Sequence, residues 1–206
     1  MNFDAFRSTV SSIPVLGRQI LRLFLPDEPH LEVQISRWRR KGKIVPLTRT
    51  LFVLGEADRK INPSRLYLAC EMYKPSYISL EYALSFHGLI PERVTEITCV
   101  STRKTRTIAN AFGNFSYRQI KTEGFTGFSS RKDEAGLPYF LAGPEKALVD
   151  FVYLNLGKFP DIRKARETLR GSYRLQNTSI LDRKRLLQSA GCFGTEKLLK
   201  IISEVR

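Results

Sequence analysis

The sequence has few of the residues that bind metals or form disulfides. Its 206 residues include three cysteines, Cys70, Cys99 and Cys192, and two histidines, His30 and His87. The cysteines lie far apart and lack CxxC spacing, so we expect them to be small buried side chains in a reducing cytosol. With only two histidines, a His-rich metal site is excluded. We therefore predict no bound metal and no other cofactor.

Long apolar runs and the common catalytic motifs are also missing. No window approaches 18 apolar residues, and the first ten residues lack a charged region followed by an apolar one. We therefore expect a cytoplasmic protein without a membrane partner. The sequence contains no GxxxxGK[ST], no GxGxxG after a strand, no HExxH and no GxSxG, so we predict that it is not an enzyme.

Positive charge is what the sequence has in excess. Lysine and arginine number 34 against 20 aspartate and glutamate residues, which gives a net charge of +14. A field of that sign attracts polyanions, and salt weakens the attraction. Nucleic acid is the expected polyanion, ahead of an anionic membrane surface, and the clustering of the basic residues argues that they do more than keep the protein soluble. The alternative, that the excess charge only keeps the protein soluble, remains open.

The densest basic cluster lies in residues 30–54. Within it, Leu31, Ile35 and Trp38 recur at helical spacing and predict a helix anchored in a core and ended by Gly42. The opposite face of this helix would carry Gln34, Arg37, Arg40 and Lys41. Glutamine can pair with adenine and arginine with guanine in the major groove of DNA. The alternative is a solvated basic face that only complements the helix dipole.

Two short strand-like runs, residues 43–47 and 51–54, follow this helix directly. They predict a hairpin with Arg49 at its tip and Pro46 on an edge strand. A recognition helix followed by such a hairpin is the order of winged helix-turn-helix modules, whose wing contacts phosphates or the minor groove. We therefore assign residues 1–58 to a winged helix-turn-helix domain. Its backbone and wing contacts are predicted to be Arg39, Lys43, Thr48 and Arg49.

Two further helices are predicted upstream. Residues 4–10 favour a short helix, and a second one is indicated by an apolar stripe that precedes two prolines. The stripe consists of Leu16, Ile20, Leu23 and Phe24, and the prolines are Pro26 and Pro29.

Residues 59–206 predict a mixed α/β domain with a small sheet and several helices, so the whole chain is expected to be α+β. Asn62 and Ser79 are candidate helix N-caps, and Gly88 is a candidate helix end. Strand-like runs cover residues 95–102, 107–120, 127–130 and 137–142, and helices are expected at 143–155, 161–169, 180–189 and 195–204. A second basic patch, which would meet DNA backbone or a different acidic partner, consists of Arg103, Lys104, Arg106 and Arg118.

A metal-dependent DNA nuclease is the enzyme worth weighing, because basic strand-rich domains often cut DNA. Such a site needs paired carboxylates and a lysine on neighbouring strands. Here Glu96 precedes a strand, while Asp133 and Glu134 lie in a turn. The nuclease is kept as an alternative, together with a basic module that binds RNA or an acidic protein.

Residues 77–85, 87–91, 98–103, 113–117 and 144–150 form a set that spans about a third of the chain. In order and spacing, this set resembles the AbiEi family of antitoxins, the regulators of AbiE-type (type IV) toxin-antitoxin systems. The N-terminal winged helix also matches the plan of the family. One stretch departs from it, because the family's wing often reads Arg-Gly-Val-Tyr where this chain has Arg49-Thr50-Leu51-Phe52. A glycine there would allow a positive φ that threonine resists.

The resemblance implies an N-terminal domain that binds inverted repeats of double-stranded DNA in its own promoter and represses transcription. It also implies a C-terminal domain that counters a nucleotidyltransferase-like toxin in phage defence, typically without forming a stable complex with it. Without the resemblance, the residues themselves support only the DNA-binding half.

Overall fold

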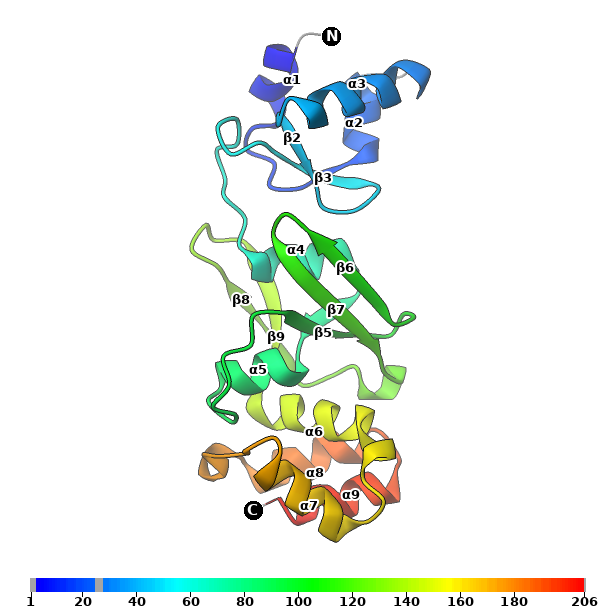
Figure 1. Ribbon diagram of the computed structural model, residues 1–206, viewed down its shortest axis with the longest axis vertical. Helices are drawn as coiled ribbons and strands as arrows, with labels where there is room; N and C mark the ends of the chain where they lie inside the picture. The colour runs from blue at the N-terminus through cyan, green and yellow to red at the C-terminus, as the bar shows by residue number, and fades with distance from the viewer. Residues whose placement is uncertain (1–2, 25–27, 206) are drawn as a thin grey trace.

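The computed structural model describes residues 3–24 and 28–205 as an elongated α+β fold, with an N-terminal unit at one end and a layer of helices at the other (Figure 1). The N-terminal unit carries an antiparallel sheet in the order β1-β3-β2. Its elements are α1 (Phe3–Val10), β1 (Leu16–Gly17), α2 (Arg18–Phe24), α3 (Glu28–Arg40), β2 (Ile44–Pro46) and β3 (Leu51–Leu54).

The second unit is built on a mixed sheet with the strand order β6-β7-β5-β4-β9-β8. Its strands are β4 (Ser76–Ile78), β5 (Ile97–Ser101), β6 (Arg106–Asn110), β7 (Gly113–Gln119), β8 (Phe128–Lys132) and β9 (Pro138–Ala142). Its helices are α4 (Arg65–Met72), α5 (Leu80–Phe86), α6 (Pro144–Leu154), α7 (Ile162–Gly171), α8 (Arg183–Gly191) and α9 (Glu196–Ser203). With six strands, the sheet is larger than the small sheet predicted.

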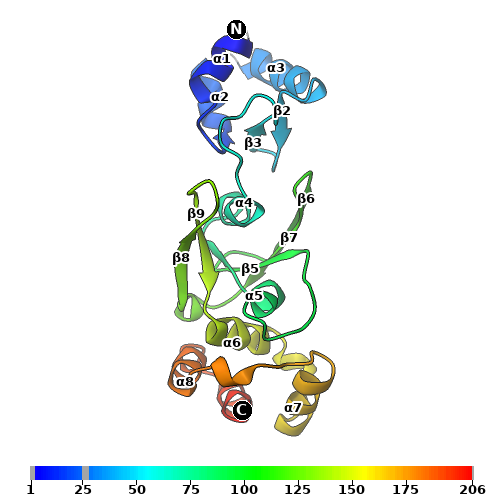
Figure 2. The same ribbon diagram turned by 90° about the vertical axis from the view of Figure 1, so that its left-hand side faces the viewer.

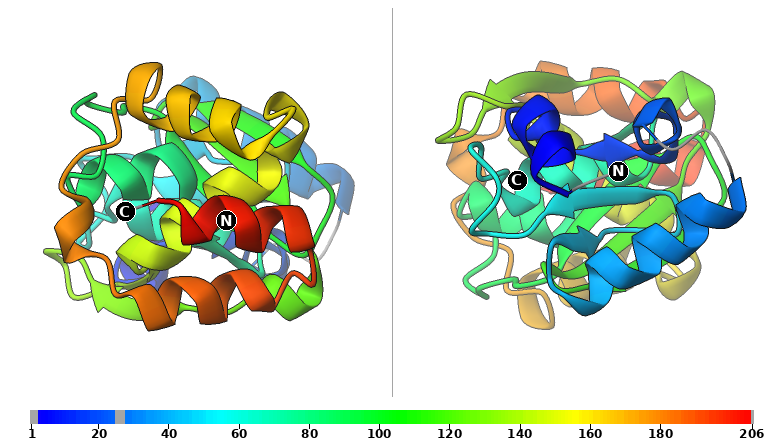
Figure 3. Two further views of the ribbon diagram at one scale, coloured as in Figure 1. Left: turned by 90° about the horizontal axis from the view of Figure 1, so that it is seen from below. Right: turned by 90° about the horizontal axis from the view of Figure 1, so that it is seen from above.

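Helices cover both faces of this sheet. Helix α4 lies on the face toward the N-terminal unit, and α5 and α6 lie on the other (Figure 2). Helices α7, α8 and α9 form an outer layer over α6 (Figure 3, left). Among the described residues, no helix has the length and apolar character needed to cross a membrane.

Several predicted helix boundaries are wrong for identifiable reasons. Leu16 and Gly17 pair with β3, so the second helix begins at Arg18 and its apolar stripe is shifted. Leu21 is therefore buried, whereas Leu23 is 81% exposed. Pro26 lies outside the described residues, and Pro29 falls in the first turn of α3, where its missing N–H costs little. The N-cap of α4 is Ser64 rather than Asn62, and the Ser64 hydroxyl accepts a hydrogen bond from Tyr67 N at 3.1 Å.

The predicted anchor of the third helix is confirmed. Leu31, Ile35 and Trp38 are all buried in the core of the N-terminal unit. The Trp38 ring stacks on Phe6 with centroids 4.8 Å apart and meets the edge of Phe3 at 5.3 Å. Burial of an indole removes roughly 200 Å² from water and contributes a few kcal/mol, so these contacts fix the orientation of α3.

The β2–β3 hairpin has a buried surface on each of its faces. Ile44, Phe52 and Leu54 join the core beneath α3. The alternate side chains, Val45, Leu47, Leu51 and Val53, pack into the core of the second unit. Because successive residues of a strand point to opposite sides, the hairpin forms a layer shared by the two cores.

Two of the three cysteines are buried as predicted, and one is not. Cys70 and Cys99 lie in the core of the second unit, whereas Cys192 is partly exposed. Burial raises the pKa of the Cys70 thiol to about 11 and also raises that of Cys99. At neutral pH both thiols are therefore protonated and behave as small apolar side chains.

Candidate nucleic-acid interface

Helix α3 ends in a defined backbone motif that turns the chain into the hairpin. Gly42 N donates to the carbonyl of Arg39 at 3.0 Å, and Lys43 N donates to that of Trp38 at 2.9 Å. This paired arrangement requires a left-handed residue, which Gly42 supplies with φ of +66°. The geometry joins α3 rigidly to β2, and Figure 3 (right) shows the helix and the hairpin together at the end of the molecule.

The outward face of α3 carries the predicted cations. Arg37, Arg40 and Lys41 are exposed and Gln34 is partly exposed, as the positions of the three buried anchors require. Within the described part of the chain, none of these three cations has an ion-pair partner or a side-chain hydrogen bond. Val33, which is 49% exposed, lies one turn before Arg37 and adds an apolar group to the same face. The face therefore offers unneutralised positive charge beside groups that can contact base edges.

The hairpin turn is held by Thr48 rather than by a left-handed residue. The Thr48 hydroxyl accepts hydrogen bonds from Thr50 N at 3.2 Å and from Leu51 N at 3.1 Å. Thr50 is not among the described residues with positive φ, so this turn does not require the glycine often found in the resembling family. Arg49 is left exposed at the tip of the turn.

A groove of about 590 Å³ separates α3 from the hairpin turn. Arg39 lines it from the helix and Arg49 from the turn. Arg18 enters it from the start of α2, paired there with Glu32, and this arginine was not singled out from the sequence. Three guanidinium groups and one carboxylate give the groove a net positive charge, which suits a phosphodiester backbone.

Lys43 and Thr48, two of the predicted backbone contacts, have other partners in the structure. Lys43 Nζ lies 3.6 Å from the Asp58 carboxylate and 4.8 Å from the centroid of the Phe3 ring. Asp58 is also 3.4 Å from Arg7, and its side chain is only 7% exposed. The charge of Lys43 is therefore partly neutralised within the protein, while the hydroxyl of Thr48 serves the turn.

The structure does not bring the second basic patch together. Arg103 lies over the ring of Tyr73 at 4.5 Å, Arg106 lies over the same ring at 5.8 Å, and the Tyr73 hydroxyl donates to the carbonyl of Lys104 at 2.7 Å. These three cations form one exposed corner at the β5–β6 turn. Arg118 lies on the opposite face of the sheet. Arg106 pairs with Tyr117, so these two side chains share a face, and successive side chains of a strand point to opposite faces, so that of Arg118 points to the other one.

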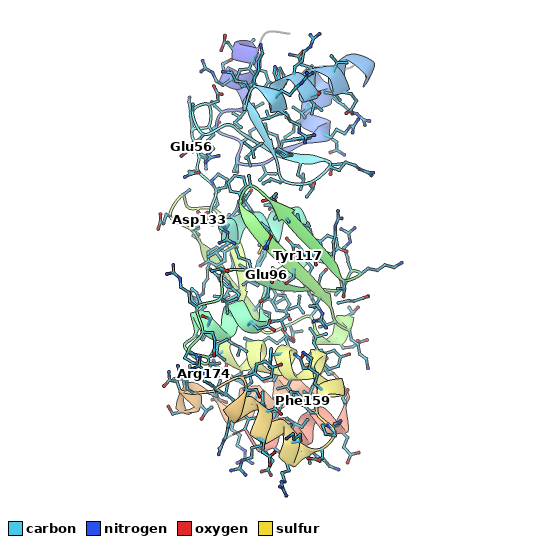
Figure 4. The ribbon with its side chains drawn as sticks, viewed as in Figure 1. Glu56, Glu96, Tyr117, Asp133, Phe159 and Arg174 are labelled. Carbon is cyan, nitrogen blue, oxygen red and sulfur yellow. The ribbon has the colours of Figure 1, made fainter. Side chains whose placement is uncertain are left out.

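Arg118 instead lines a cleft with several carboxylates. This cleft of about 650 Å³ runs along β5 and β7 beside α5. Its charged lining residues are Glu81, Glu92, Glu96 and Arg118. One of the carboxylates, Glu92, also pairs with Arg174 at 2.5 Å. Figure 4 shows Glu96 and Arg174 in the second unit, well below α3. The lining of this cleft is therefore mainly acidic, whereas the exposed face of α3 is basic.

A buried polar network ties the sheet to α6, and local sequence patterns do not reveal it. Lys146 Nζ lies 2.5 Å from Asp150 Oδ1, and both side chains are at most 2% exposed. Asp150 Oδ2 accepts hydrogen bonds at 2.8 Å from the hydroxyls of Tyr77 and Ser79. The Ser79 side chain therefore bonds to Asp150 and makes no capping bond to α5.

Burial is the strongest influence on the ionisation of this network. It raises the pKa of the Asp150 carboxyl, although the Lys146 ammonium and the hydrogen bonds from Tyr77 and Ser79 oppose it. Desolvation and the neighbouring carboxylate both raise the pKa of Tyr77, so its hydroxyl remains a donor. The network joins Tyr77 and Ser79 to Lys146 and Asp150 of α6, and its burial indicates a structural role.

In the comparisons with known proteins, no family model matches the chain, and no curated protein gives a significant match.

Proposed function

We propose that the chain is a sequence-specific DNA-binding protein whose residues 1–58 act as a winged helix-turn-helix domain. The order α1-β1-α2-α3-β2-β3 and a sheet ordered β1-β3-β2 support this proposal. The observation that carries it is the outward face of α3, where Arg37, Arg40 and Lys41 are exposed and unpaired among the described residues. Beside that face, the hairpin presents Arg49 across a basic groove.

In this proposal, α3 enters the major groove of double-stranded DNA. Arg37 and Gln34 would contact base edges, and Arg40 and Lys41 would neutralise phosphates at the C-terminal end of the helix. Arg49 at the wing tip would contact the flanking minor groove or its phosphates. Arg39, which lines the groove between α3 and the hairpin turn, would contact the DNA backbone that lies between these two elements.

The biological role that we propose is that of a transcriptional autorepressor and antitoxin. It rests on the resemblance of residues 77–150 to the AbiEi family, whose regulators bind inverted repeats in their own promoter. Its functional partner would be a nucleotidyltransferase-like toxin, countered without a stable complex. A reading frame for such a toxin directly beside this gene would support the role, and a neighbourhood without one would count against it.

A salt titration tests the DNA-binding proposal. We expect the wild-type protein to bind short duplexes, with an affinity that falls linearly in a log-log plot against salt concentration. Each neutralised phosphate contributes a slope of about −0.9, so four or five contacts would weaken binding by roughly 150- to 500-fold between 50 and 200 mM salt. Fluorescence anisotropy of a labelled duplex measures this. Salt-independent binding, or none at 50 mM salt, would contradict the proposal.

Two alternatives are separated by parallel assays. A basic module for RNA or for an acidic protein would prefer RNA or heparin over duplex DNA in competition. A nuclease would nick plasmid DNA with Mg²⁺ or Mn²⁺. In residues 3–24 and 28–205, no group of three or more His, Cys, Asp or Glu side chains is arranged to hold a metal ion.

A further inference from the structure

The second unit contacts the predicted wing directly. The Asn110 side chain, at the turn between β6 and β7, donates from Nδ2 to the carbonyl of Leu47 at 3.0 Å. Leu47 is the residue before Thr48, on which the hairpin turn closes. Figure 2 shows the β6–β7 turn reaching up to the N-terminal unit beneath the hairpin.

Asn110 is itself held in place by local bonds. Its Oδ1 accepts a hydrogen bond from Phe112 N at 2.8 Å, which closes the β6–β7 turn, and its Nδ2 also lies 3.2 Å from the sulfur of Met72. The Phe112 ring in the same turn lies 5.9 Å from the guanidinium of Arg59, which follows the hairpin. The donor that reaches Leu47 is therefore fixed by the second unit and not by the hairpin.

Leu47 connects the second unit to the turn that carries Arg49. Leu47 and Val53 are at most 2% exposed and belong to the core of the second unit. The turn that carries Arg49 is closed onto Leu51 by backbone bonds of 2.9 Å from Leu47 N and 3.2 Å from Thr48 N. A displacement of Leu47 would therefore move the whole turn, and the Arg49 side chain with it.

We propose that Asn110 is a positioning residue for DNA recognition, because it holds the hairpin so that Arg49 contacts DNA while α3 occupies the major groove. The inference rests on the proposed DNA-binding function and adds to it a role for the second unit. A hairpin free to shift would lose a contact that the α3 contacts cannot replace, since a misplaced charge contributes less to binding.

Asn110→Asp is the variant that removes the Nδ2 donor, with its bonds to Leu47 and Met72, and keeps the Oδ1 acceptor. The aspartate keeps an oxygen for Phe112 N, so the β6–β7 turn remains closed. It replaces the donor to Leu47 with a carboxylate oxygen that repels the carbonyl. Asn114→Asp is the matched control, because Asn114 is exposed on the same β6–β7 hairpin and receives the same negative charge. Asn110→Ala removes the donor without adding charge, but it also removes the oxygen that accepts from Phe112 N.

The experiment is a double-mutant cycle on a duplex selected from a random library by the wild-type protein. We expect Asn110→Asp and Arg49→Ala each to weaken binding by roughly tenfold, and the double variant to be no weaker than either one. Both should reduce the salt slope by about 1, whereas Asn114→Asp should change the affinity less than about twofold. When Asn110→Asp is combined with Arg37→Ala, the two losses of affinity should multiply, because the α3 contacts do not depend on the position of the hairpin.

The outcomes distinguish this inference from the function on which it rests. If the losses of affinity from Asn110→Asp and Arg49→Ala multiply in the double variant, the positioning role is wrong and the DNA interface stands. The same holds if Asn110→Asp changes the affinity as little as Asn114→Asp does. If Arg37→Ala with Lys41→Ala leaves the affinity unchanged, both the interface and the positioning role are wrong. Thermal melting of each variant shows whether Asn110→Asp destabilises the fold as a whole. In that case the substitution would lower the DNA affinity by the same factor in the Arg49→Ala and Arg37→Ala variants, and this result would contradict the proposal.

Discussion

Replacing Arg37 and Lys41 with alanine should weaken duplex binding by roughly a hundredfold or more at fixed salt, since a bidentate base contact contributes about 1–3 kcal/mol and a phosphate contact adds to it. Arg37 is exposed on α3 and Lys41 is exposed directly after it, and neither has an ion-pair or side-chain hydrogen-bond partner within the described residues, so their loss removes no internal contact. The salt slope should become shallower by about 1 to 2. Melting temperature should be unchanged, because Leu31, Ile35 and Trp38 still anchor the helix.

A control variant with the same change in net charge separates the loss of direct DNA contacts from a weaker long-range attraction to DNA. Arg183 and Lys184 are exposed at the start of α8, at the end of the molecule opposite α3 (Figure 1). Replacing both with alanine removes two positive charges far from the proposed interface. We expect a change of at most about threefold at physiological salt, where the screening length is about 8 Å. Equal losses in the two double variants would show that α3 is only a solvated basic face.

The second large effect is expected on stability, from Asp150→Asn. The substitution preserves the shape of the side chain but leaves the buried Lys146 ammonium without a counter-charge. Breaking a buried pair by removing one partner costs about 3–5 kcal/mol, which is a large part of the stability of a typical domain. Urea unfolding followed by circular dichroism measures the loss. A change below about 0.5 kcal/mol would show that the network does not stabilise the fold.

Two companion variants sharpen that measurement. Lys146→Met combined with Asp150→Asn removes both charges, and we expect it to be more stable than Asp150→Asn alone, because no unpaired charge remains buried. Glu167→Gln breaks an exposed pair with Arg163 on α7 and should leave the unfolding midpoint nearly unchanged. At temperatures where it is folded, Asp150→Asn should bind DNA as the wild type does.

Local patterns were sufficient to predict α3 and the hairpin. Three apolar residues at helical spacing defined the buried face of α3, and a glycine marked its end, so the exposed face followed by geometry. The hairpin followed from two short apolar runs and their connection. These features depend on neighbours in sequence, which is why they could be placed without a structure.

Contacts between distant segments could not be predicted in this way. Tyr77 and Asp150 are 73 residues apart, and nothing local indicates that the hydroxyl and the carboxylate meet. The second partner of the hairpin was also missed, although its continuous run Leu51–Leu54 carried a signal. A strand with apolar residues on both faces is typical of burial on both sides. Arg118 was grouped with Arg106 by proximity in sequence, whereas the alternation of β7 places them on opposite faces.

We propose that α3 occupies the major groove while the hairpin contacts the minor groove beside it. Dimethyl sulfate protection on a selected duplex tests this directly, because the reagent modifies guanine N7 in the major groove and adenine N3 in the minor groove. We expect the wild-type protein to protect both. Arg37→Ala should lose protection at guanine N7, and Arg49→Ala should lose it only at flanking adenine N3. Binding without protection at guanine N7 would contradict the account.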